Sequence, residues 1–420
     1  MIGQRIEEAD NTRSMLICAE LKKRGHEVIM WTSAFDHIRK EWRKEYLENK
    51  DHFIHPKFGF KIKFFKGCGY KRNMSFMRFF DHWLGARDFV KQAKNSKLPN
   101  VILASIPDHF TAAIASDFGK KNNIPVIIDV RDKWPDIFPG MVKNNFLSLL
   151  ISISIFFERK RIYKGIKKSY AVVAMMDSLL DWGLKAAQRD KSKLDSLFYL
   201  TPFDNNFDTG LKIHGELNEN VSSVLKRLEG KIVFTYIGTF NRSQHPTLLL
   251  QAIEILVNTY RIDMSKIEFI IGGHGLDAET VEAESSKFAN VTYLGWLNTN
   301  NMMAVLSKSD VGLLLLRYPF PALNNKCFAY MSNGLAMINS ADGPIFELIN
   351  EYQFGININA GSPGEIAKAI KSICDSPEKL AQMRENSKYV FKKLFDKSEN
   401  YRNYANHIEL VVSEFQKRLN

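Results

Sequence analysis

The feature that most constrains the fold of this chain is an alternation of short apolar runs with longer amphipathic stretches. The first series of runs predicts buried parallel strands at residues 28–32, 101–104, 126–130 and 171–174. A second series predicts strands at residues 232–237, 267–271, 291–294, 311–315 and 336–338. Stretches with helical spacing, such as residues 12–24, lie between the runs. The sequence therefore predicts βαβ units and an α/β fold.

Chain length and a polar break predict two doubly wound domains. The chain has 420 residues, and single cores rarely grow beyond about 250–300 residues. Residues 203–230 are rich in Asp, Asn, Gly and Glu, so we interpret them as a linker with an exposed helix. We predict an N-terminal domain at 1–202, a C-terminal domain at 231–395 and a final helix at 396–420 that crosses back to the N-terminal domain.

The predicted N-terminal domain lacks the strand that ordinarily opens a doubly wound fold. Polar residues 1–11 lead directly into the helix predicted at 12–24. We expect either that the sequence starts late or that the sheet is one strand short.

Composition bounds the kind of protein. The four cysteines are scattered, which excludes a zinc ribbon and predicts reduced thiols in a cytoplasmic protein without a metal centre. The polar N-terminus predicts no signal peptide, and no apolar run reaches the roughly 20 residues of a membrane-spanning helix. The formal net charge of +12 favours anionic partners.

Two basic segments favour an anionic membrane surface as one such partner. Cationic and aromatic residues interleave at 57–87, and six cationic residues at 159–168 follow the apolar run at 146–157. This pattern suits peripheral binding at the inner face of the cell membrane. No RNA-binding signature accompanies it, so no nucleic-acid partner is predicted. The alternative is two strands and a core helix with solvated lysines.

Glycine-rich loops follow strands of the second series, at the sheet edge where ligands bind in open α/β folds. Gly238 follows the strand predicted at 232–237, and a Gly-Gly-His-Gly loop follows the strand at 267–271. Glycines let the backbone approach phosphate, and helix N-termini supply free N–H groups. The C-terminal half is therefore expected to bind an anionic ligand.

The second half also resembles a known family. The ordered segments are YIGTF, IGGHG, VTYLGWL, SDVGLLLL, NNKCFAYMSNGLAMI and GPIFELI. Together they resemble the retaining, family-4-type bacterial glycosyltransferases of polysaccharide and O-antigen synthesis. The resemblance implies a GT-B architecture, in which two Rossmann-like domains face a cleft and the C-terminal domain holds a nucleotide-diphospho-sugar donor. It implies no cofactor and no essential metal.

Five donor-binding residues follow from the resemblance. Gly238 and Thr239 would lie at the donor diphosphate, His274 and Gly275 beside the nucleotide base, and Lys326 against phosphate. The alternatives are plain turn glycines, a solvated histidine and a surface lysine.

The sequence departs from the family at two places on the donor side. Thr239 and Gln244 stand where the family often carries two cations, and Arg242 lies between them as a substitute or as an exposed loop arginine. Ala329 replaces the glutamate that accepts a ribose hydroxyl, which would cost about 1.5–3 kcal/mol of binding.

Acceptor-side candidates come from the first half. In the segment RDKWP, which resembles RDLWP of the same family branch, Arg131 and Asp132 are the catalytic candidates and Trp134 would shape the acceptor wall. Asp132 could instead cap a helix or pair with Arg131, and Trp134 could be core. Further acceptor-side candidates are Asn11, Arg13 and Asp36. Asn11 could equally be a helix cap.

The sequence thus predicts transfer of a sugar, with retention, to a hydroxyl of a lipid-linked glycan in cell-surface polysaccharide synthesis. Two alternatives stay open. Ala329 and the missing strand favour a catalytically impaired relative that binds or scaffolds. A GT-B nucleotide-sugar epimerase would need convergent acid and base groups, for which Asp132 is the one candidate.

Overall fold

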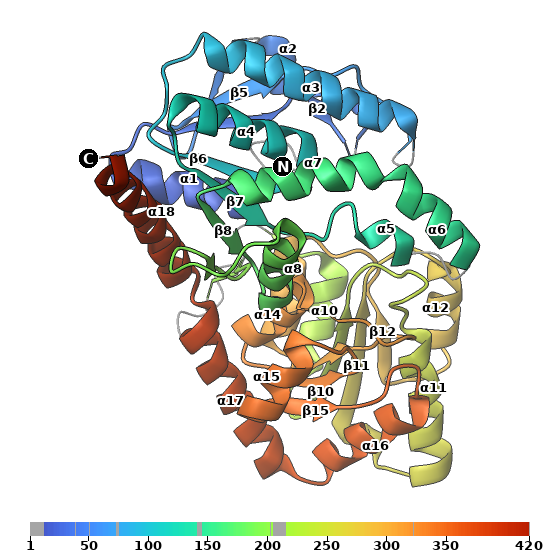
Figure 1. Cartoon of the computed structure of the whole chain (residues 1–420). Helices are drawn as coiled ribbons and strands as arrows, with labels where there is room; N and C mark the ends of the chain where they lie inside the picture. The colour runs from blue at the N-terminus through green and yellow to red at the C-terminus, as the bar shows by residue number, and fades with distance from the viewer. Residues whose placement is uncertain are drawn as a thin grey trace. The chain divides into compact units, whose positions relative to one another are not determined.

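The structure, a computed structural model, describes residues 12–37, 39–49, 51–72, 75–140, 145–201, 203–204, 216–321 and 323–419. The chain divides into two units. Unit 1 comprises Met1–Leu200 with Ser398–Asn420, and unit 2 comprises Thr201–Lys397 (Figure 1). The final helix, α18 (Lys397–Leu419), lies almost wholly in unit 1.

Unit 1 contains a four-stranded and a three-stranded sheet. The four-stranded sheet is parallel, in the order β6 (Ile102–Ile106), β7 (Val126–Val130), β8 (Ala171–Ala174) and β9 (Ser196–Leu197). The other sheet has the order β1 (Ile29–Ser33), β5 (Lys61–Phe65) and β4 (Phe53–Ile54), with β1 and β5 parallel. A short hairpin joins β2 (Phe35–Asp36) to β3 (Glu41–Trp42).

The four-stranded sheet is covered on both faces, because successive side chains of a strand point to opposite sides. Ile127 packs in one cluster with helix residues Ile17 and Tyr404, whereas Ile128 packs in another with Ile162. The helices of unit 1 are α1 (Arg13–Lys23), α2 (Lys44–Glu48), α3 (Phe76–Lys94), α4 (His109–Asn122), α5 (Ile137–Gly140), α6 (Asn145–Ser154), α7 (Phe156–Lys168), α8 (Asp177–Ala187) and α18.

The strands of unit 1 differ from the single sheet that the alternation predicts. In the described part of the chain, β1 and β6 are not paired with each other, so the strands form separate sheets. One apolar cluster still joins them, since it contains Phe65 of β5, Phe89 of α3 and Ile106 of β6. Unit 1 therefore keeps the layers of a doubly wound fold, although no strand hydrogen bonds join its four-stranded and three-stranded sheets in the described part of the chain.

Unit 2 is built on one six-stranded parallel sheet. Its order is β12 (Val291–Tyr293), β11 (Ile267–Gly272), β10 (Ile232–Ile237), β13 (Val311–Leu314), β14 (Ala336–Asn339) and β15 (Gly355–Asn357). In chain order this is 3-2-1-4-5-6, the Rossmann arrangement, in which the direction of winding reverses between the first and fourth strands. All five strands predicted for this half are confirmed, and β15 is added.

Helices cover the sheet of unit 2, and most strand residues are fully buried. The helical elements are α10 (Glu219–Lys226), α11 (Thr247–Ile255), η2 (Leu256–Tyr260), η3 (Met264–Lys266), α12 (Ala278–Ser285), α13 (Thr299–Ser307), α14 (Asn325–Ser332), α15 (Pro344–Tyr352), α16 (Pro363–Cys374) and α17 (Pro377–Phe395).

The helix predicted to be exposed in the linker is α10, and that expectation is wrong for one of its faces. Val221 and Val224 are buried against Val233 and Ile270 of the sheet. They are three residues apart, so they lie on the same side of the helix, and burying them stabilises α10 on unit 2.

Candidate functional site

The carboxyl edge of the unit 2 sheet carries the candidate site. Winding reverses between β10 and β13, and ligands of open α/β sheets bind outside the carboxyl ends of the strands at such a reversal. The loop after β10 begins with Gly238, and the segment after β13 leads to α14. This edge therefore has the geometry expected of a ligand site.

Glycines let two loops approach each other and a side chain from α14. Gly238 has φ 147°, and a Cβ there would lie 2.2 Å from Cε and 2.6 Å from Nζ of Lys326. Gly273 also has φ 147°, and a Cβ there would lie 1.9 Å from the Gly238 carbonyl oxygen. Side chains at either position would push these groups apart, so both glycines are needed for packing and not only for a turn.

Lys326 is placed at the start of α14 by a helix cap. The Asn324 side-chain oxygen accepts a hydrogen bond from the Lys326 backbone N–H at 3.1 Å. The ammonium lies 4.5 Å from the centre of the Tyr236 ring. It is buried with no hydrogen-bond partner among the described residues. Burial lowers the pKa of Lys326 to about 8.

An unpartnered buried ammonium is costly unless a ligand supplies the missing acceptor. Two neighbouring groups point to an anion as that ligand. The Tyr236 hydroxyl is also buried without a hydrogen-bond partner in the described structure. Burial raises its pKa, and the nearby positive charge of Arg317 opposes that rise.

Arg317 is a second cation at this edge, and it was not among the residues predicted from the sequence. Its backbone N–H donates to the Ser243 carbonyl at 2.8 Å, and its Nη2 donates to Thr247 Oγ1 at 2.9 Å. Within the described ranges it has no ion-pair partner. The signal that could have found it is its position at the end of the apolar run 311–316, near the reversal of winding.

The other donor-side candidates lie on the same edge but differ in exposure. Thr239 and Arg242 are exposed, the latter in a turn held by the Asn241 side-chain oxygen. Ala329 is 3% exposed inside α14. A methyl group there offers no acceptor, so the helix presents its charge only through Lys326.

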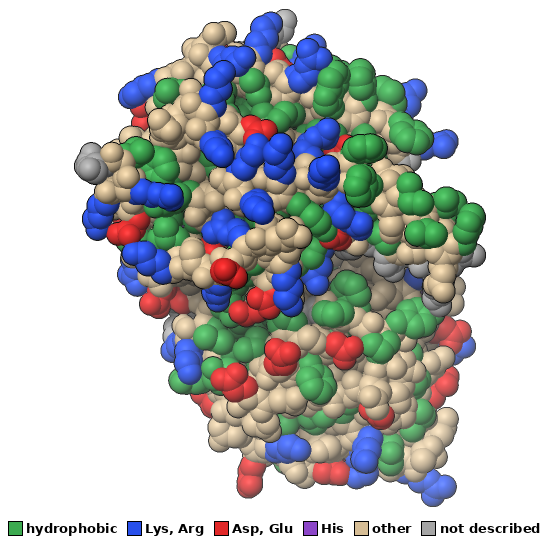
Figure 2. Space-filling model, viewed as in Figure 1, with side chains coloured by type: hydrophobic (Ala, Val, Ile, Leu, Met, Phe, Trp, Pro, Cys, Tyr) green, Lys and Arg blue, Asp and Glu red, His purple; other side chains and the backbone are tan. Residues whose placement is uncertain are grey.

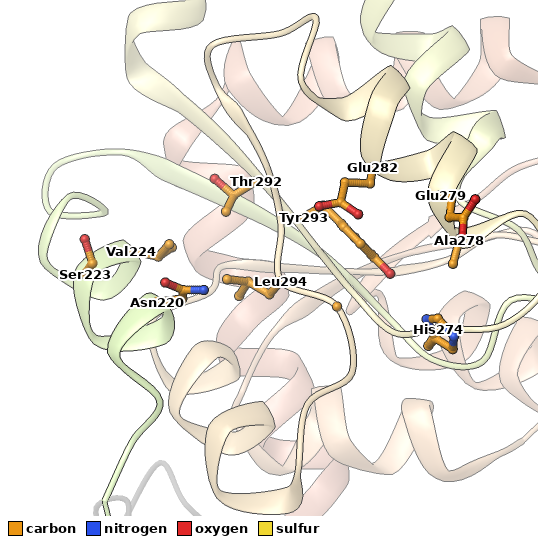
Figure 3. A pocket seen from close by; sticks show the side chains of 11 residues that line it. Asn220, Ser223, Val224, His274, Ala278, Glu279, Glu282, Thr292, Tyr293 and Leu294 are labelled. Carbon is orange, nitrogen blue, oxygen red and sulfur yellow. The ribbon is translucent and has the colours of Figure 1, made fainter.

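His274 lines a pocket of about 520 Å³, and Gly275 follows it in the chain (Figure 3). Gly275 has φ 142° and is bridged to Phe240, whose backbone N–H donates to the His274 carbonyl at 3.0 Å. His274 is exposed and lines the pocket together with Tyr293, whose hydroxyl donates to the Gly273 carbonyl at 3.0 Å. In Figure 3 the hydroxyl end of Tyr293 points toward His274. Two rings at a pocket wall suit a planar base.

In unit 1, Arg13 is buried in an ion-pair network. Its Nε and Nη2 donate to the two carboxylate oxygens of Asp129 at 2.9 and 3.1 Å. Its Nη1 donates to the backbone carbonyls of Phe198 and Tyr199, and its guanidinium lies 4.9 Å from the centre of the Tyr404 ring. This geometry favours a structural role that ties α1 and α18 to β7.

Arg131 completes this network from the other side. Its Nε donates to Asp129 at 2.8 Å and its Nη1 to Ser14 Oγ at 3.0 Å. Asp129, which was not a candidate, is therefore the centre of a triad. Burial alone would raise the pKa of its carboxyl, but the charges of Arg13 and Arg131 outweigh burial and hold the pKa below its ordinary value.

Asp132 and Trp134 lie close by in different environments. Asp132 is half-buried, and burial raises the pKa of its carboxyl. It makes no ion pair with Arg131 in the described structure. Trp134 is 8% exposed and packs edge-on against Phe138 with ring centres 4.4 Å apart. The core interpretation of Trp134 is thus favoured over an acceptor wall.

The last two acceptor-side candidates are placed as follows. Asp36 is buried; Arg43 Nη1 lies 3.6 Å from one of its carboxylate oxygens, and the other accepts the Arg39 backbone N–H at 3.1 Å. Asn11 lies outside the described residues.

A protein-family model identifies the domain that carries the unit 2 edge. The model described as glycosyl transferases group 1 matches residues 218–390, which include the whole edge. Residues 218–390 form a glycosyl transferases group 1 domain. This domain match supports an enzyme of the glycosyltransferase class. A search of the curated proteins found no match.

Solved structures resemble the whole chain and not only its group 1 domain. HepE of Anabaena in complex with UDP is 12% identical and covers 97% of this chain and 96% of its own, with a TM-score of 0.64. Sucrose-phosphate synthase of Thermosynechococcus elongatus is 13% identical over 96% and 93%, with a TM-score of 0.66. A trehalose 6-phosphate synthase of Burkholderia multivorans is 11% identical over 98% and 97%, with a TM-score of 0.67. These likenesses show the GT-B fold of two Rossmann-like domains.

Proposed function

We propose that this glycosyltransferase moves a sugar, with retention, from a nucleotide-diphospho-sugar to a hydroxyl of a lipid-linked glycan in cell-surface polysaccharide synthesis. The observation that carries the donor half of the proposal is the buried ammonium of Lys326, which has no acceptor in the described structure and lies against Gly238. A diphosphate supplies the missing negative charge. Similar structures support this ligand, because HepE was solved with UDP and with UDP-glucose.

The leaving diphosphate is the group that gains charge when the sugar departs. Lys326 and Arg317 would stabilise that charge, together with the positive end of the α14 helix dipole. Arg317 then takes the place of the second cation that is absent at Thr239 and Gln244. Gly238 lets the phosphates come close to the backbone, and the pocket at His274 and Tyr293 takes the base.

The acceptor half of the proposal rests on unit 1. Asp132 is a half-buried carboxyl whose raised pKa suits proton exchange with a hydroxyl. Arg131 lies one residue away and is fixed by Asp129. We assign residues 1–202 to acceptor binding and residues 231–395 to the donor, with the enzyme acting at the inner face of the cell membrane.

Ala329 favours a second candidate function, a GT-B relative that binds nucleotide-sugars or glycans without turnover. Its buried methyl group cannot accept a ribose hydroxyl, so ribose is held less tightly. Ribose contacts remote from the reacting carbon contribute to turnover as well as to binding.

A donor panel separates the two candidates. Release of UDP or GDP from a set of nucleotide-sugars is measured with the full chain, without and with short glycan lipids. Nucleotide release above the rate of the heat-denatured protein supports the enzyme. Binding of a donor without release supports the binding relative, and the absence of both overturns the proposal.

Donor affinity is expected to fall as pH rises above about 8. The pKa of Lys326 is lowered from 10.5 to about 8, so the free protein carries the ammonium below that pH and loses it above. The affinity for UDP should then fall by about tenfold per pH unit above 8, because binding must first restore the proton. Calorimetric titration with UDP at several pH values checks this. A flat profile across this range would contradict a role for the Lys326 charge.

A further inference from the structure

Helix α6 is polar toward the protein and apolar toward its surroundings. None of its described side chains is buried, and Phe146, Leu149 and Ile153 are 69%, 57% and 62% exposed. Ser148 and Ser152 are less exposed, and Ser148 contacts the neighbouring helix. Ser148 Oγ donates to the Pro139 carbonyl of α5 at 3.0 Å, and Ser152 Oγ donates to the Ser148 carbonyl at 2.9 Å. This is the reverse of a helix on a water-facing surface, and it excludes the alternative of a core helix.

The next helix continues this surface with aromatic and then cationic residues. Phe156 and Phe157 are 53% and 73% exposed, and Lys160, Lys164 and Lys167 are exposed on the same helix. At 3.6 residues per turn, these five positions of α7 fall within about 100° of one another around the helix axis. The opposite side of α7 is buried through Ile162 and Ile166.

These three lysines differ from the other cations of α7. Arg159 pairs with Asp136, Arg161 with Glu158 and Lys168 with Asp117. Among the described residues, no ion-pair partner accompanies Lys160, Lys164 or Lys167. Their charge is therefore available to an external anion.

A third apolar group lies at the start of α3, and contacts join it to α6. Phe76 is 93% exposed. Two residues on, the Arg78 guanidinium lies 4.9 Å from the centre of the Trp134 ring, and Trp134 packs on Phe138 of α5. Helix α5 holds Ser148 of α6 through Pro139. Figure 2 shows apolar side chains gathered along this edge of unit 1.

We propose that α6 lies in the interface of an anionic lipid bilayer, with its apolar side among the acyl chains and the three α7 lysines on lipid phosphates. Ten residues of helix extend about 15 Å, half of the roughly 30 Å hydrocarbon core, so α6 is suited to lie in the surface. In the part of the chain that the structure describes, no helix is long and apolar enough to cross a membrane. The combination of an apolar side and adjacent lysines matches an anionic bilayer better than a neutral one.

This inference deepens the membrane location proposed above and is independent of the donor site. The test is co-sedimentation of the full chain with vesicles of phosphatidylcholine, with and without phosphatidylglycerol. The wild type should bind the mixed vesicles. Leu149→Glu/Ile153→Glu should weaken this binding by about tenfold or more, because two apolar side chains leave the acyl region. Leu98→Glu, at another exposed leucine of unit 1 (51%), should bind like the wild type.

A second pair of variants tests the lysines. Lys160→Glu/Lys164→Glu/Lys167→Glu should lose the preference for phosphatidylglycerol, whereas Lys120→Glu/Lys121→Glu at the end of α4 should keep it. Equal sedimentation of the wild type and the α6 variant would overturn the proposal. So would a wild-type dimer, seen by analytical ultracentrifugation, that the α6 variant dissociates without any vesicle binding. UDP titration of each variant keeps failure of this proposal distinct from failure of the donor site.

Discussion

Replacing Lys326 by methionine is expected to lower donor turnover by about 100-fold or more without lowering the melting temperature. Preorganised donors to a developing negative charge contribute roughly 10²–10³ in rate, and Lys326 is the cation nearest Gly238. Methionine keeps much of the side-chain volume beside Tyr236. It also removes a buried ammonium that has no hydrogen-bond partner in the described structure, so the desolvation cost that is lost offsets the lost contact with the Tyr236 ring.

A loss of turnover without a loss of thermal stability distinguishes a ligand-binding lysine from a structural one. Lys308→Ala, at an exposed lysine after α13, serves as the control and should change neither quantity. Nucleotide release and thermal unfolding are measured on all three proteins. Turnover within threefold of wild type in Lys326→Met would remove the basis of the proposed donor site, and a clear fall in melting temperature would indicate a packing role.

Replacing Asp129 by asparagine is expected to destabilise unit 1 by about 3–5 kcal/mol, the usual cost of removing one partner of a buried ion pair. The change leaves the Arg13 guanidinium, which is 2% exposed, without its counter-charge. For a unit of this size the melting temperature should fall by about 10 °C.

The control for this prediction is an ion pair of the same unit that lies in water. Lys44 Nζ and Glu48 Oε1 are 3.6 Å apart, with side chains 74% and 58% exposed. Glu48→Gln should change stability by less than about 1 kcal/mol. Urea or thermal unfolding followed by circular dichroism measures both, and equal effects of the two substitutions would contradict a structural triad.

Asp129 also makes the stability of unit 1 depend on pH, with a loss of stability in acid. The pKa of its carboxyl is held below the ordinary 3.8, so the folded state binds this proton less readily than the unfolded state. The stabilisation is complete above the unfolded pKa and is lost as pH falls through the folded one. In Asp129→Asn this acid-dependent loss should be smaller than in the wild type.

Sequence periodicity was sufficient to predict the layered α/β architecture, and motif spacing was sufficient to select the carboxyl edge of unit 2 as the candidate site. Periodicity depends on local side-chain chemistry, so runs such as 126–130 and 232–237 were placed to the residue. The loop glycines and Lys326 were found because motif spacing on one strand–loop–helix unit is also local. The resemblance supplied the class of enzyme, which the group 1 domain match bears out at the level of that domain.

Which polar groups contact one another became known only from the folded chain. Arg13 and Asp129 are 116 residues apart in the chain, so no local pattern could show that an expected acceptor residue is the buried partner of a β7 carboxylate. Arg317, in the loop after β13, donates to Thr247 at the start of α11. The valines of α10 pack on strands that come later in the sequence. The exposure of the apolar side of α6 could not be predicted from the sequence either. An apolar run is compatible with burial in a protein core and with contact to a lipid bilayer. Local sequence fixes what each segment can bury, whereas long-range contacts fix against what it is buried.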